Sequence, residues 1–519
     1  MPGCFTDTRV RLLRLIPLAL AAVVGLLTID AGFVFDDPSA LLQSPVVTGE
    51  VPWWEAFTRD YWGRPIDGGV NSWRPLMPMV WALLWKLFPD NPLPFHALSL
   101  LLHVLATALA TRLARALRGS EPWAIAVGTL FAVHPLNTEA VGAIVAQSDL
   151  LSFSMVLCAC LIALKPATLT RGLACAAVLL GAALAKESAI IFAPLVALLI
   201  GLQPGAPRTR WVAAVPTAIA MITVIGFQLA LPRRETMAMW GNTLAHEVLG
   251  YQRILLGLYT MGRSLVMSVW PHPLAPSHGY AAIELHPQVL WPFASVGAVL
   301  LVAGVAGGLW AIRARRADWI AALSFLYAPA LLQSHWFVRL ITDLAERLLY
   351  PTTLGAAMIV AAAAFRWLPR TQVRRLALGG IAVSALLFSV SARRAWVSDY
   401  ALWSNGVRLE PRAMRHQYNL SNELIRRDQL DDAAFHRLVA VYLVNRFPER
   451  VEWEKVEALR TLSPPDRFVE LPAALYPDAP CPVIVAFLKQ NEDIRSLHQH
   501  VIQPWLDRYP GCFVVSETP

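Results

Sequence analysis

Long apolar runs alternate with short basic turns along most of the chain. A helix that crosses the hydrocarbon core of a membrane takes about 20 residues, and most of these runs approach that length. The apolar run at residues 76–88 is too short to cross, so we expect it to lie along the membrane surface. The remaining pattern predicts about eleven membrane spans. These are residues 12–29, 93–111, 122–133, 141–164, 172–185, 188–203, 211–231, 288–312, 318–334, 348–365 and 376–392.

The composition indicates a polytopic membrane protein. The chain has 519 residues, of which 56% are hydrophobic and 15% charged, and its mean hydropathy is +0.49. Soluble domains carry about 25% charged residues, so this balance argues against a soluble enzyme. The net charge of +8 comes from basic residues clustered in short loops, which is typical of cytoplasmic loops and needs no nucleic acid. The alternation predicts that the amino end lies inside and the tail outside.

Most polar groups with catalytic potential fall on the turns of one face. The alternation of spans places them all outside, where we expect long loops at residues 30–92 and 233–287. Residues brought together from separate loops are the usual way to build a site. One more acid, Asp149, lies in an apolar run, where acids are seldom without function. The outer candidates are Asp36, Asp37, Arg74, His134, Glu139, Lys186, Glu187, Arg339, Arg347 and Tyr350.

Two adjacent acids, Asp36 and Asp37, follow the first apolar run, and Pro38 stops a helix behind them. A charged pair at a membrane boundary is costly, which favours a role in an outer cavity over a simple helix stop in a solvated loop. Two neighbouring carboxylates could also hold a divalent cation. No complete ligand set is visible, so we predict no metal ligands.

Several short motifs occur one after another over residues 30–435. They are Phe35-Asp36-Asp37, Trp73-Arg74-Pro75-Leu76, Phe95-His96, His134-Pro135, Thr138-Glu139-Ala140-Val141, Asp149-Leu150-Leu151, Lys186-Glu187 and Ala345-Glu346-Arg347-Leu348-Leu349-Tyr350-Pro351. Together they resemble the TMTC family of transmembrane O-mannosyltransferases, within the GT-C class of glycosyltransferases. The chain departs from the family at Gln147, where a basic residue is usual, and its tetratricopeptide array is cut to about one unit.

This resemblance implies an all-α, GT-C-type transmembrane bundle at residues 1–394. It also implies an inverting enzyme that moves a sugar, mannose, from a polyprenyl phosphate to a hydroxyl of an exported protein. In GT-C enzymes the first outer loop carries the catalytic aspartate. Asp36 is therefore the expected base, with Asp37 as its rival or helper.

The chemistry assigns roles to the other candidates. An acceptor hydroxyl needs a carboxylate to take its proton, and a departing phosphate is stabilised by fixed cations. Arg347 and Tyr350 resemble the family's lipid-phosphate site, and Arg339 and Lys186 are further phosphate candidates. We expect the substrates to contact Arg74, His134, Glu139, Asp149 and Glu187. Alternatively, several of these residues cap helices or form ion pairs between spans.

Two other functions remain open at this point. The acceptor could be a lipid or a surface glycan in place of a protein. The chain could also be a lipid-linked sugar transporter or flippase without covalent chemistry. Transporters typically show internal repeats with matching broken helices, and no such repeat is visible here.

Residues 395–519 are predicted to form a small outer helical domain. The stretch from Trp403 to Ala434 resembles one tetratricopeptide unit, which cannot bury its own apolar face and must lean on neighbours. Such a domain would be either a lid over the cavity or a platform for the acceptor. Cys481 and Cys512 could form a disulfide there. The Ala-, Arg- and Leu-rich composition suggests a bacterial inner membrane with a periplasmic active site.

Overall fold

A computed structural model of the chain describes residues 12–69, 72–232, 250–276, 278, 287–338, 340, 342–445 and 508. Within the predicted outer loop at residues 233–287, the structure describes a helix at Gly250–Met267. Residues 233–249 and 279–286 of that loop and the two tail cysteines lie outside the described residues. So do most of the tail beyond residue 445 and the disulfide predicted there.

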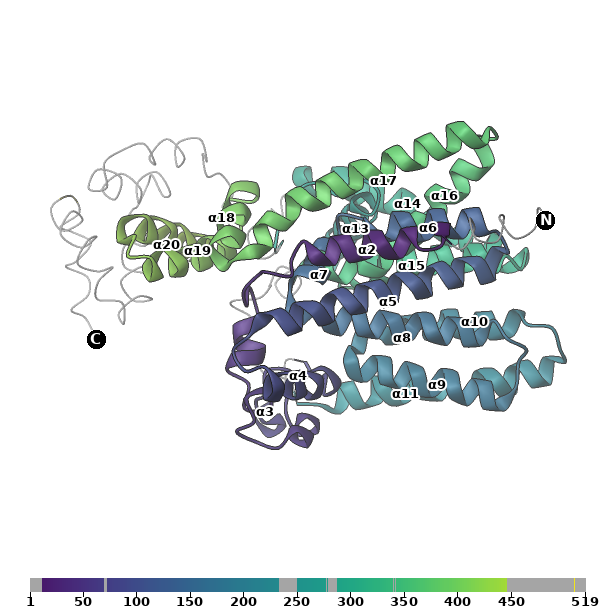
Figure 1. The fold of residues 1–519 in the computed structure, drawn as a ribbon, viewed down its shortest axis with the longest axis horizontal. Helices are drawn as coiled ribbons and strands as arrows, with labels where there is room; N and C mark the ends of the chain where they lie inside the picture. Colours follow the sequence, from purple (N-terminus) through teal and green to yellow (C-terminus); the bar gives the residue numbers. More distant parts are fainter. Residues whose placement is uncertain are drawn as a thin grey trace.

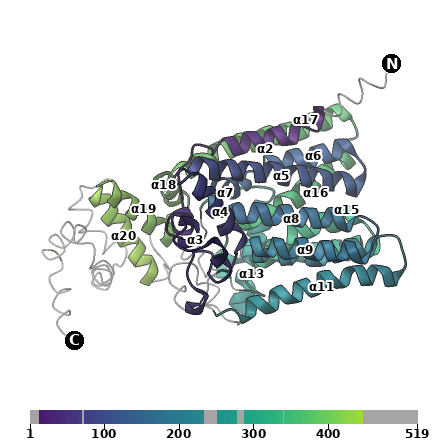
Figure 2. The same ribbon diagram turned by 60° about the horizontal axis from the view of Figure 1, so that its bottom comes forward.

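The described residues fold into a bundle of helices that run side by side, with three tail helices projecting from one end (Figures 1 and 2). The bundle helices are α2 (Ile16–Leu26), α5 (Pro92–Arg118), α6 (Glu121–Ala132), α8 (Gln147–Ala163), α9 (Leu169–Ala185), α10 (Ala193–Leu202), α11 (Pro207–Ala230), α13 (Gly250–Met267), α14 (Pro287–Arg313), α15 (Ala317–Leu332), α16 (Tyr350–Trp367) and α17 (Thr371–Arg393).

Short helices gather at the end of the bundle where the tail is attached; we call it the Asp36 end. They are η1 (Pro38–Leu42), α3 (Pro45–Thr48), η2 (Trp53–Phe57), η3 (Ile66–Gly68), α4 (Leu76–Leu87), α7 (Asn137–Gly142), η4 (Ile144–Ala146), η5 (Glu187–Phe192), η7 (Glu346–Leu349) and η8 (Arg394–Val397). The tail helices are α18 (Asp399–Leu409), α19 (Met414–Arg426) and α20 (Leu430–Asn445).

The helix ends follow ordinary capping chemistry. Asn91 precedes α5 and accepts a hydrogen bond from the Leu93 amide, while Gly119 ends the helix in the left-handed region at φ 68°. Ser398 caps α18 in the same way through the amide of Ala401. These sequence-local signals fix where the chain turns back at each end of the bundle.

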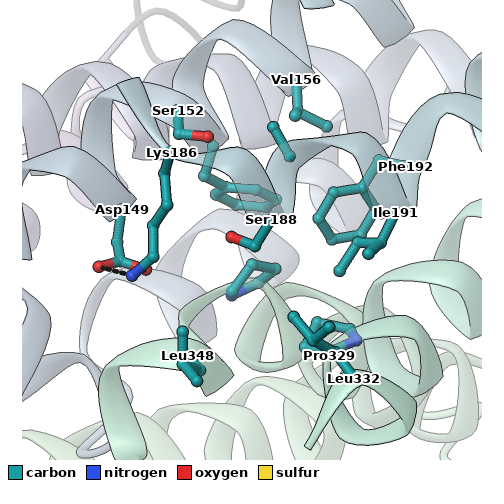
Figure 3. Close-up of a pocket in the computed structure, with 13 residues that line it drawn as sticks. Asp149, Ser152, Val156, Lys186, Ser188, Ile191, Phe192, Pro329, Leu332 and Leu348 are labelled. Atoms are coloured by element: carbon teal, nitrogen blue, oxygen red, sulfur yellow. Dashed lines mark hydrogen bonds and ion pairs between the residues drawn. The ribbon is translucent and has the colours of Figure 1, made fainter. Parts of the chain in front are cut away.

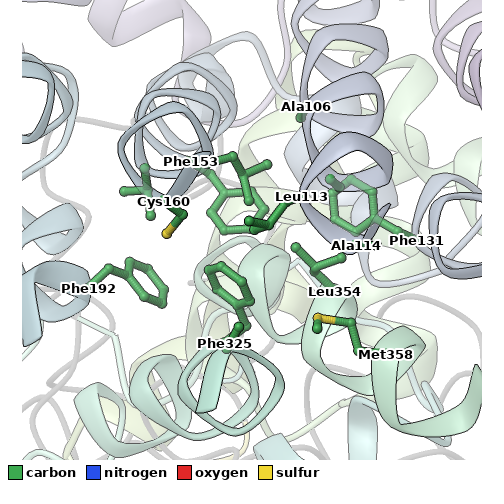
Figure 4. Close-up of a cluster of buried hydrophobic side chains, with 14 of the residues drawn as sticks. Ala106, Leu113, Ala114, Phe131, Phe153, Cys160, Phe192, Phe325, Leu354 and Met358 are labelled. Carbon is green, nitrogen blue, oxygen red and sulfur yellow. The ribbon is translucent and has the colours of Figure 1, made fainter. Parts of the chain in front are cut away.

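Buried aromatic rings fill the centre of the bundle (Figure 4). The Phe153 ring on α8 packs edge-on against Phe325 on α15, with ring centroids 5.6 Å apart. It also contacts Phe192 and Tyr350 at 6.2 and 5.6 Å. Edge-to-face aromatic pairs of this kind add about 0.5–1.5 kcal/mol beyond burial. They join α8, η5, α15 and α16 in one packed core.

Helices α13 and α14 approach each other closely because glycines face each other at the contact. A Cβ atom on Gly262 would lie 2.2 Å from the carbonyl oxygen of Phe293, and one on Gly297 would lie 2.0 Å from that of Leu258. Any larger residue would therefore push the two backbones apart. Small residues at helix contacts are typical of packing within a membrane.

Among the described residues, six helical segments are long and apolar enough to cross a membrane, and five shorter apolar helices accompany them. The all-helical membrane fold predicted from the sequence is confirmed. The count of about eleven spans stays a prediction. The six segments are Pro92–Arg118, Ile144–Ala163, Pro207–Ala230, Gln288–Arg313, Glu346–Trp367 and Thr371–Val397.

The predicted span at residues 141–164 is interrupted near its start. The chain passes through the short helix α7, and Ala143 adopts an extended conformation before η4 and α8 begin. The amides of Ile144 and Val145 donate to the carboxylate of Asp37. A single continuous helix is therefore replaced by a turn that anchors the Asp36–Asp37 loop.

Candidate functional site at the Asp36 end

The two neighbouring aspartates point in opposite directions. Asp37 is fully buried and accepts backbone hydrogen bonds from Val34, Ile144 and Val145 at 3.1, 3.3 and 2.8 Å. Burial raises the pKa of Asp37 to about 8, against the lowering effect of these backbone donors. The geometry thus gives Asp37 the task of joining the first loop to the start of α8.

Asp36, by contrast, faces the tail. Its Oδ1 accepts a hydrogen bond from Nη2 of Arg415 on α19 at 2.7 Å, and 22% of its side chain is exposed. The preceding residue, Phe35, has a φ of 64°, a left-handed conformation that is uncommon for a bulky residue. This turn separates the outward carboxylate from the buried one.

Three ion pairs from separate elements lie near this loop. Arg347 in η7 contacts Glu139 in α7 at 2.7 Å, and its backbone amide donates to the same carboxylate at 2.9 Å. Arg74, just before α4, holds Glu187 through two hydrogen bonds of 2.7 and 2.8 Å. The third pair consists of Lys186 and Asp149, two further candidate site residues.

That third pair is Lys186 with Asp149, whose two carboxylate oxygens both lie 2.5 Å from Nζ of the lysine. The two side chains are 3% and 7% exposed, so both charges are removed from water. Burying an ion pair has a large desolvation cost that the attraction only partly offsets. Such a pair is a poor way to gain stability and therefore a good candidate for function.

The separate pairs form one electrostatic cluster. Arg347 is attracted by both Asp36 and Asp149 in addition to its partner Glu139. Lys186 is in turn repelled by Arg74 and Arg347. The guanidinium of Arg347 also lies 5.3 Å from the ring centroid of Phe35, directly beside the Asp36 loop. The acids and cations that the sequence placed on separate loops therefore meet at one end of the bundle.

A small recess lies next to this cluster (Figure 3). Asp149 and Lys186 stand at its polar side, and Ser152 and Ser188 add hydroxyls. The rest of its wall is apolar. These residues are Phe153, Val156, Ala189, Ile191, Phe192, Pro329, Leu332, Leu348 and Pro351. The chemistry of this lining matches a ligand with one charged end and one apolar end.

Two predicted site residues, Tyr350 and His134, contact core groups outside the charged cluster. Tyr350 is fully buried, and its hydroxyl lies 2.8 Å from Nδ1 of His103 within the core. His134 uses Nε2 to bond the carbonyl oxygen of Ser268 at 3.0 Å. Arg339 lies outside the described residues. Tyr350 and His134 thus hold helices together in this structure, and their proposed ligand contacts stay predictions.

A further buried network, which the sequence reasoning missed, joins the tail to the bundle. Oε1 of Glu410, at the end of α18, lies 2.7 Å from Nη2 of Arg263 and 2.5 Å from Nδ1 of His278. The other ring nitrogen of His278 lies 3.1 Å from Glu346. Burial would lower the pKa of His278, but the charge of Glu410 helps to raise it to about 9. No sequence motif links these residues, which lie up to 147 positions apart.

Within the described part of the chain, no group of three or more His, Cys, Asp or Glu side chains is arranged to hold a metal ion. Asp36 and Asp37, the pair suggested for a cation, turn away from each other toward Arg415 and the Val145 amide. This geometry does not fit a shared divalent cation.

An apolar helical bundle with buried ion pairs collected at one end defines an integral membrane protein with a candidate site at the membrane boundary. The chain is homologous to protein O-mannosyl-transferases of the TMTC family, which confirms the resemblance seen in the motifs. It is 32% identical over 321 residues to Protein O-mannosyl-transferase Tmtc1 of Drosophila melanogaster, which covers 57% of this chain and 37% of the relative.

Two other relatives extend the comparison. Protein O-mannosyl-transferase F38B6.6 of Caenorhabditis elegans is 26% identical over 79% of this chain and 59% of its own length. Protein O-mannosyl-transferase Tmtc2 of Drosophila melanogaster is 43% identical over 25% of this chain and 14% of its own length. The matched region thus spans less than two thirds of the length of each of these relatives. No family model matches the chain, and no solved structure matches it significantly.

Proposed function

We propose that the protein is an inverting glycosyltransferase that moves mannose from a polyprenyl phosphate to a Ser or Thr hydroxyl of an exported protein. The observation that carries this proposal is that Asp36, Arg347 and the Lys186–Asp149 pair lie at one end of the bundle, beside a mostly apolar recess with one polar side. The names of the homologues support a protein acceptor and mannose. The described site supports the same reaction independently of those names.

Asp36 is the proposed base. It is the outward member of the aspartate pair and is partly exposed, so an acceptor hydroxyl can reach it. One of its carboxylate oxygens takes the hydroxyl proton while the hydroxyl oxygen forms a bond to the anomeric carbon. The bond from that carbon to the phosphate oxygen breaks on the opposite side, and its electrons stay with the phosphate. Direct displacement inverts the anomeric carbon.

The cations of the cluster are the proposed phosphate contacts. Arg347 and Lys186 already hold Glu139 and Asp149, so an incoming phosphate competes with carboxylates for fixed positive charges. Guanidinium and ammonium groups held in place stabilise the charge that grows on the leaving phosphate without reorganising. The apolar wall of the recess suits the lipid carbons next to that phosphate.

The remaining candidate residues have supporting roles in this proposal. Arg74 and Glu187 form a two-hydrogen-bond pair that borders the cluster and positions its cations and acids. Asp37 and Glu139 act as anchors, the first for the Asp36 loop and the second for Arg347. We place the reaction on the outer side of a bacterial inner membrane, the side that the arginine distribution assigns to the Asp36 end.

The test is transfer by the purified full chain in lipid nanodiscs, with radiolabelled polyprenyl-phosphate-mannose and a Ser/Thr-rich peptide. Asp36→Asn removes the base and keeps the shape, so we expect transfer to fall by about 10²-fold or more. Asp30→Asn is the matched control, because Asp30 is exposed and pairs only with Arg393 in the described structure. Full activity of Asp36→Asn would remove the assignment of the base.

The same assay separates the alternatives. Incorporation of label into lipid or glycan but not into peptide would replace the protein acceptor. Movement of the intact donor across the bilayer, without any product, would replace the enzyme with a transporter. A product with the donor's own anomeric configuration would contradict direct displacement.

A further inference from the structure

The tail helices hold the Asp36 loop through several independent contacts. The backbone amide of Phe35 donates to Oδ1 of Asp399, the first residue of α18, at 2.7 Å. The Phe35 ring stacks on Trp403 with centroids 5.7 Å apart and an interplanar angle of 30°. It also meets Trp396 edge-on at 6.0 Å. The left-handed turn at Phe35 is therefore fixed by residues from about 360 positions later in the chain.

Arg415 adds a different kind of contact. Its guanidinium lies over the face of Phe35, 4.6 Å from the ring centroid, and 6.0 Å from the centroid of Trp403. Aromatic faces attract cations and limit their motion. From this fixed position Nη2 donates to Oδ1 of Asp36 at 2.7 Å. The tail thus places one hydrogen-bond donor on one oxygen of the proposed base.

We propose that Arg415 is a positioning residue that orients the Asp36 carboxylate for the acceptor hydroxyl. This inference rests on the proposed function of Asp36 as the base. The contact uses Oδ1 only, which leaves Oδ2 as the oxygen that takes the acceptor proton. The site is consequently shared between the bundle and the tail, and it is incomplete without α19.

The alternative is an ion pair that only strengthens the fold. Partly exposed pairs of this kind contribute about 0–1 kcal/mol, and the two side chains here are 25% and 22% exposed. The tail is already attached through Trp396, Trp403 and Asp399. Fold stability therefore gives little reason to place an arginine on Asp36.

A second alternative is a latch in which Arg415 blocks the base until an acceptor displaces it. A blocking arginine would be expected to engage both carboxylate oxygens through its two-pronged guanidinium. The single contact at Oδ1 does not do this. Arg347 approaches the same Phe35 ring at 5.3 Å, so the residue before Asp36 contacts one cation from η7 and one from the tail. This arrangement orients the carboxylate and leaves it open.

The experiment compares Arg415→Ala, Arg415→Gln and Arg415→Lys in the full chain, with polyprenyl-phosphate-mannose and a Ser/Thr peptide as probes. We expect Arg415→Ala to lower kcat by about 10–100-fold, a part of the contribution of a general base, with the donor KM changed less than about twofold. Lysine can still place one donor on Oδ1, so Arg415→Lys should recover most of kcat. Arg415→Gln keeps a hydrogen-bond donor and removes the charge, so it shows whether the charge matters.

Arg408→Ala is the matched control, because Arg408 is an exposed tail arginine that bonds Asn405. Each variant is also checked by thermal unfolding, and equal unfolding temperatures with unequal kcat support positioning. In the Asp36→Asn background, Arg415→Ala should cause no further loss, because the group that it orients is already gone.

Three results would overturn the inference. They are a kcat of Arg415→Ala within twofold of the unmodified protein, a faster rate that indicates a latch, and a loss that only follows unfolding and is not recovered by lysine. Failure of the proposed function gives a separate signal. In that case Asp36→Asn itself remains active, whatever Arg415 does.

Discussion

The two ends of the bundle both collect charged residues, but they treat them differently. At the end opposite Asp36, Arg14 and Arg115 share Glu121, and Arg118 and Arg316 share Asp318. The four arginines, Arg14, Arg115, Arg118 and Arg316, are 39%, 53%, 31% and 43% exposed, and the shared acids Glu121 and Asp318 are 24% and 9% exposed.

At the Asp36 end, both members of the Lys186–Asp149 pair are buried, and Arg347, which is 20% exposed, holds a buried Glu139. Glu139, Lys186 and Asp149 are 1%, 3% and 7% exposed. Exposed ion pairs have a small desolvation cost, whereas buried pairs have a cost of several kcal/mol per ion. Exposed basic residues at the ends of spans also set the orientation of a protein in the membrane. The comparison teaches that burial of charge, more than its presence, marks the end that carries the chemistry.

The largest effect should come from breaking one buried pair. Arg347→Ala leaves Glu139 buried without its partner, which should destabilise the protein by about 3–5 kcal/mol and weaken donor binding. Thermal unfolding in detergent and the donor KM measure the two effects. Arg316→Ala at the opposite end should cost about 1 kcal/mol or less.

The double variant Arg347→Met with Glu139→Gln separates stability from function. It removes both charges and should recover most of the lost stability without recovering donor binding. Equal stability costs for Arg347→Ala and Arg316→Ala would contradict the contrast between the two ends. An unchanged donor KM in the double variant would remove Arg347 from the phosphate site.

A smaller effect concerns the attachment of the tail to the Asp36 end. The folded pKa of His278, about 9, lies above the ordinary value of 6.5. The contribution of His278 to the free energy of unfolding is therefore fully present below about pH 6.5 and is lost as the pH rises through 9. A shift of this size corresponds to about 3 kcal/mol.

Unfolding temperatures measured from pH 6 to 10 test this contribution. The unmodified protein should lose stability across that range, and His278→Gln should show a flatter profile. Parallel profiles for the two proteins would show that His278 does not hold the tail through its charge.

The smallest expected effect is on the donor KM, when a recess at one end or the other is filled. Ser188→Trp fills the recess beside Lys186 and should raise the donor KM about tenfold, equivalent to about 1.4 kcal/mol. Ile359→Trp fills a second small recess, which lies near Arg118 at the opposite end of the bundle. That control should leave the donor KM unchanged. Equal effects of both variants would show that the donor lipid does not enter beside Lys186.

Much of this arrangement could be predicted from the sequence because it depends on local patterns. The apolar run at residues 93–111 became the core of α5, and that at 376–392 became most of α17. The same alternation brought Arg74, Lys186 and Arg347 to one end, because each lies at a turn between helices. Successive turns alternate between the two ends of the bundle, so every second turn lies at the same end.

Pairing within that end could not be predicted, because it depends on contacts between distant residues. Lys186 pairs with Asp149 and Arg74 with Glu187, although Lys186 and Glu187 are neighbours in sequence. An extended backbone at Lys186 sends the two side chains to different partners. Arg415 lies within the tetratricopeptide-like stretch of the tail, and nothing in that pattern gives it a partner, so only the structure shows that it reaches Asp36.

A structure of the purified protein with bound polyprenyl-phosphate-mannose would test the central claim most directly. The account predicts the phosphate at Arg347 and Lys186, the lipid carbons in the adjoining recess, and the sugar facing Asp36. A donor phosphate bound elsewhere, with Asp36 out of reach of the sugar, would contradict it.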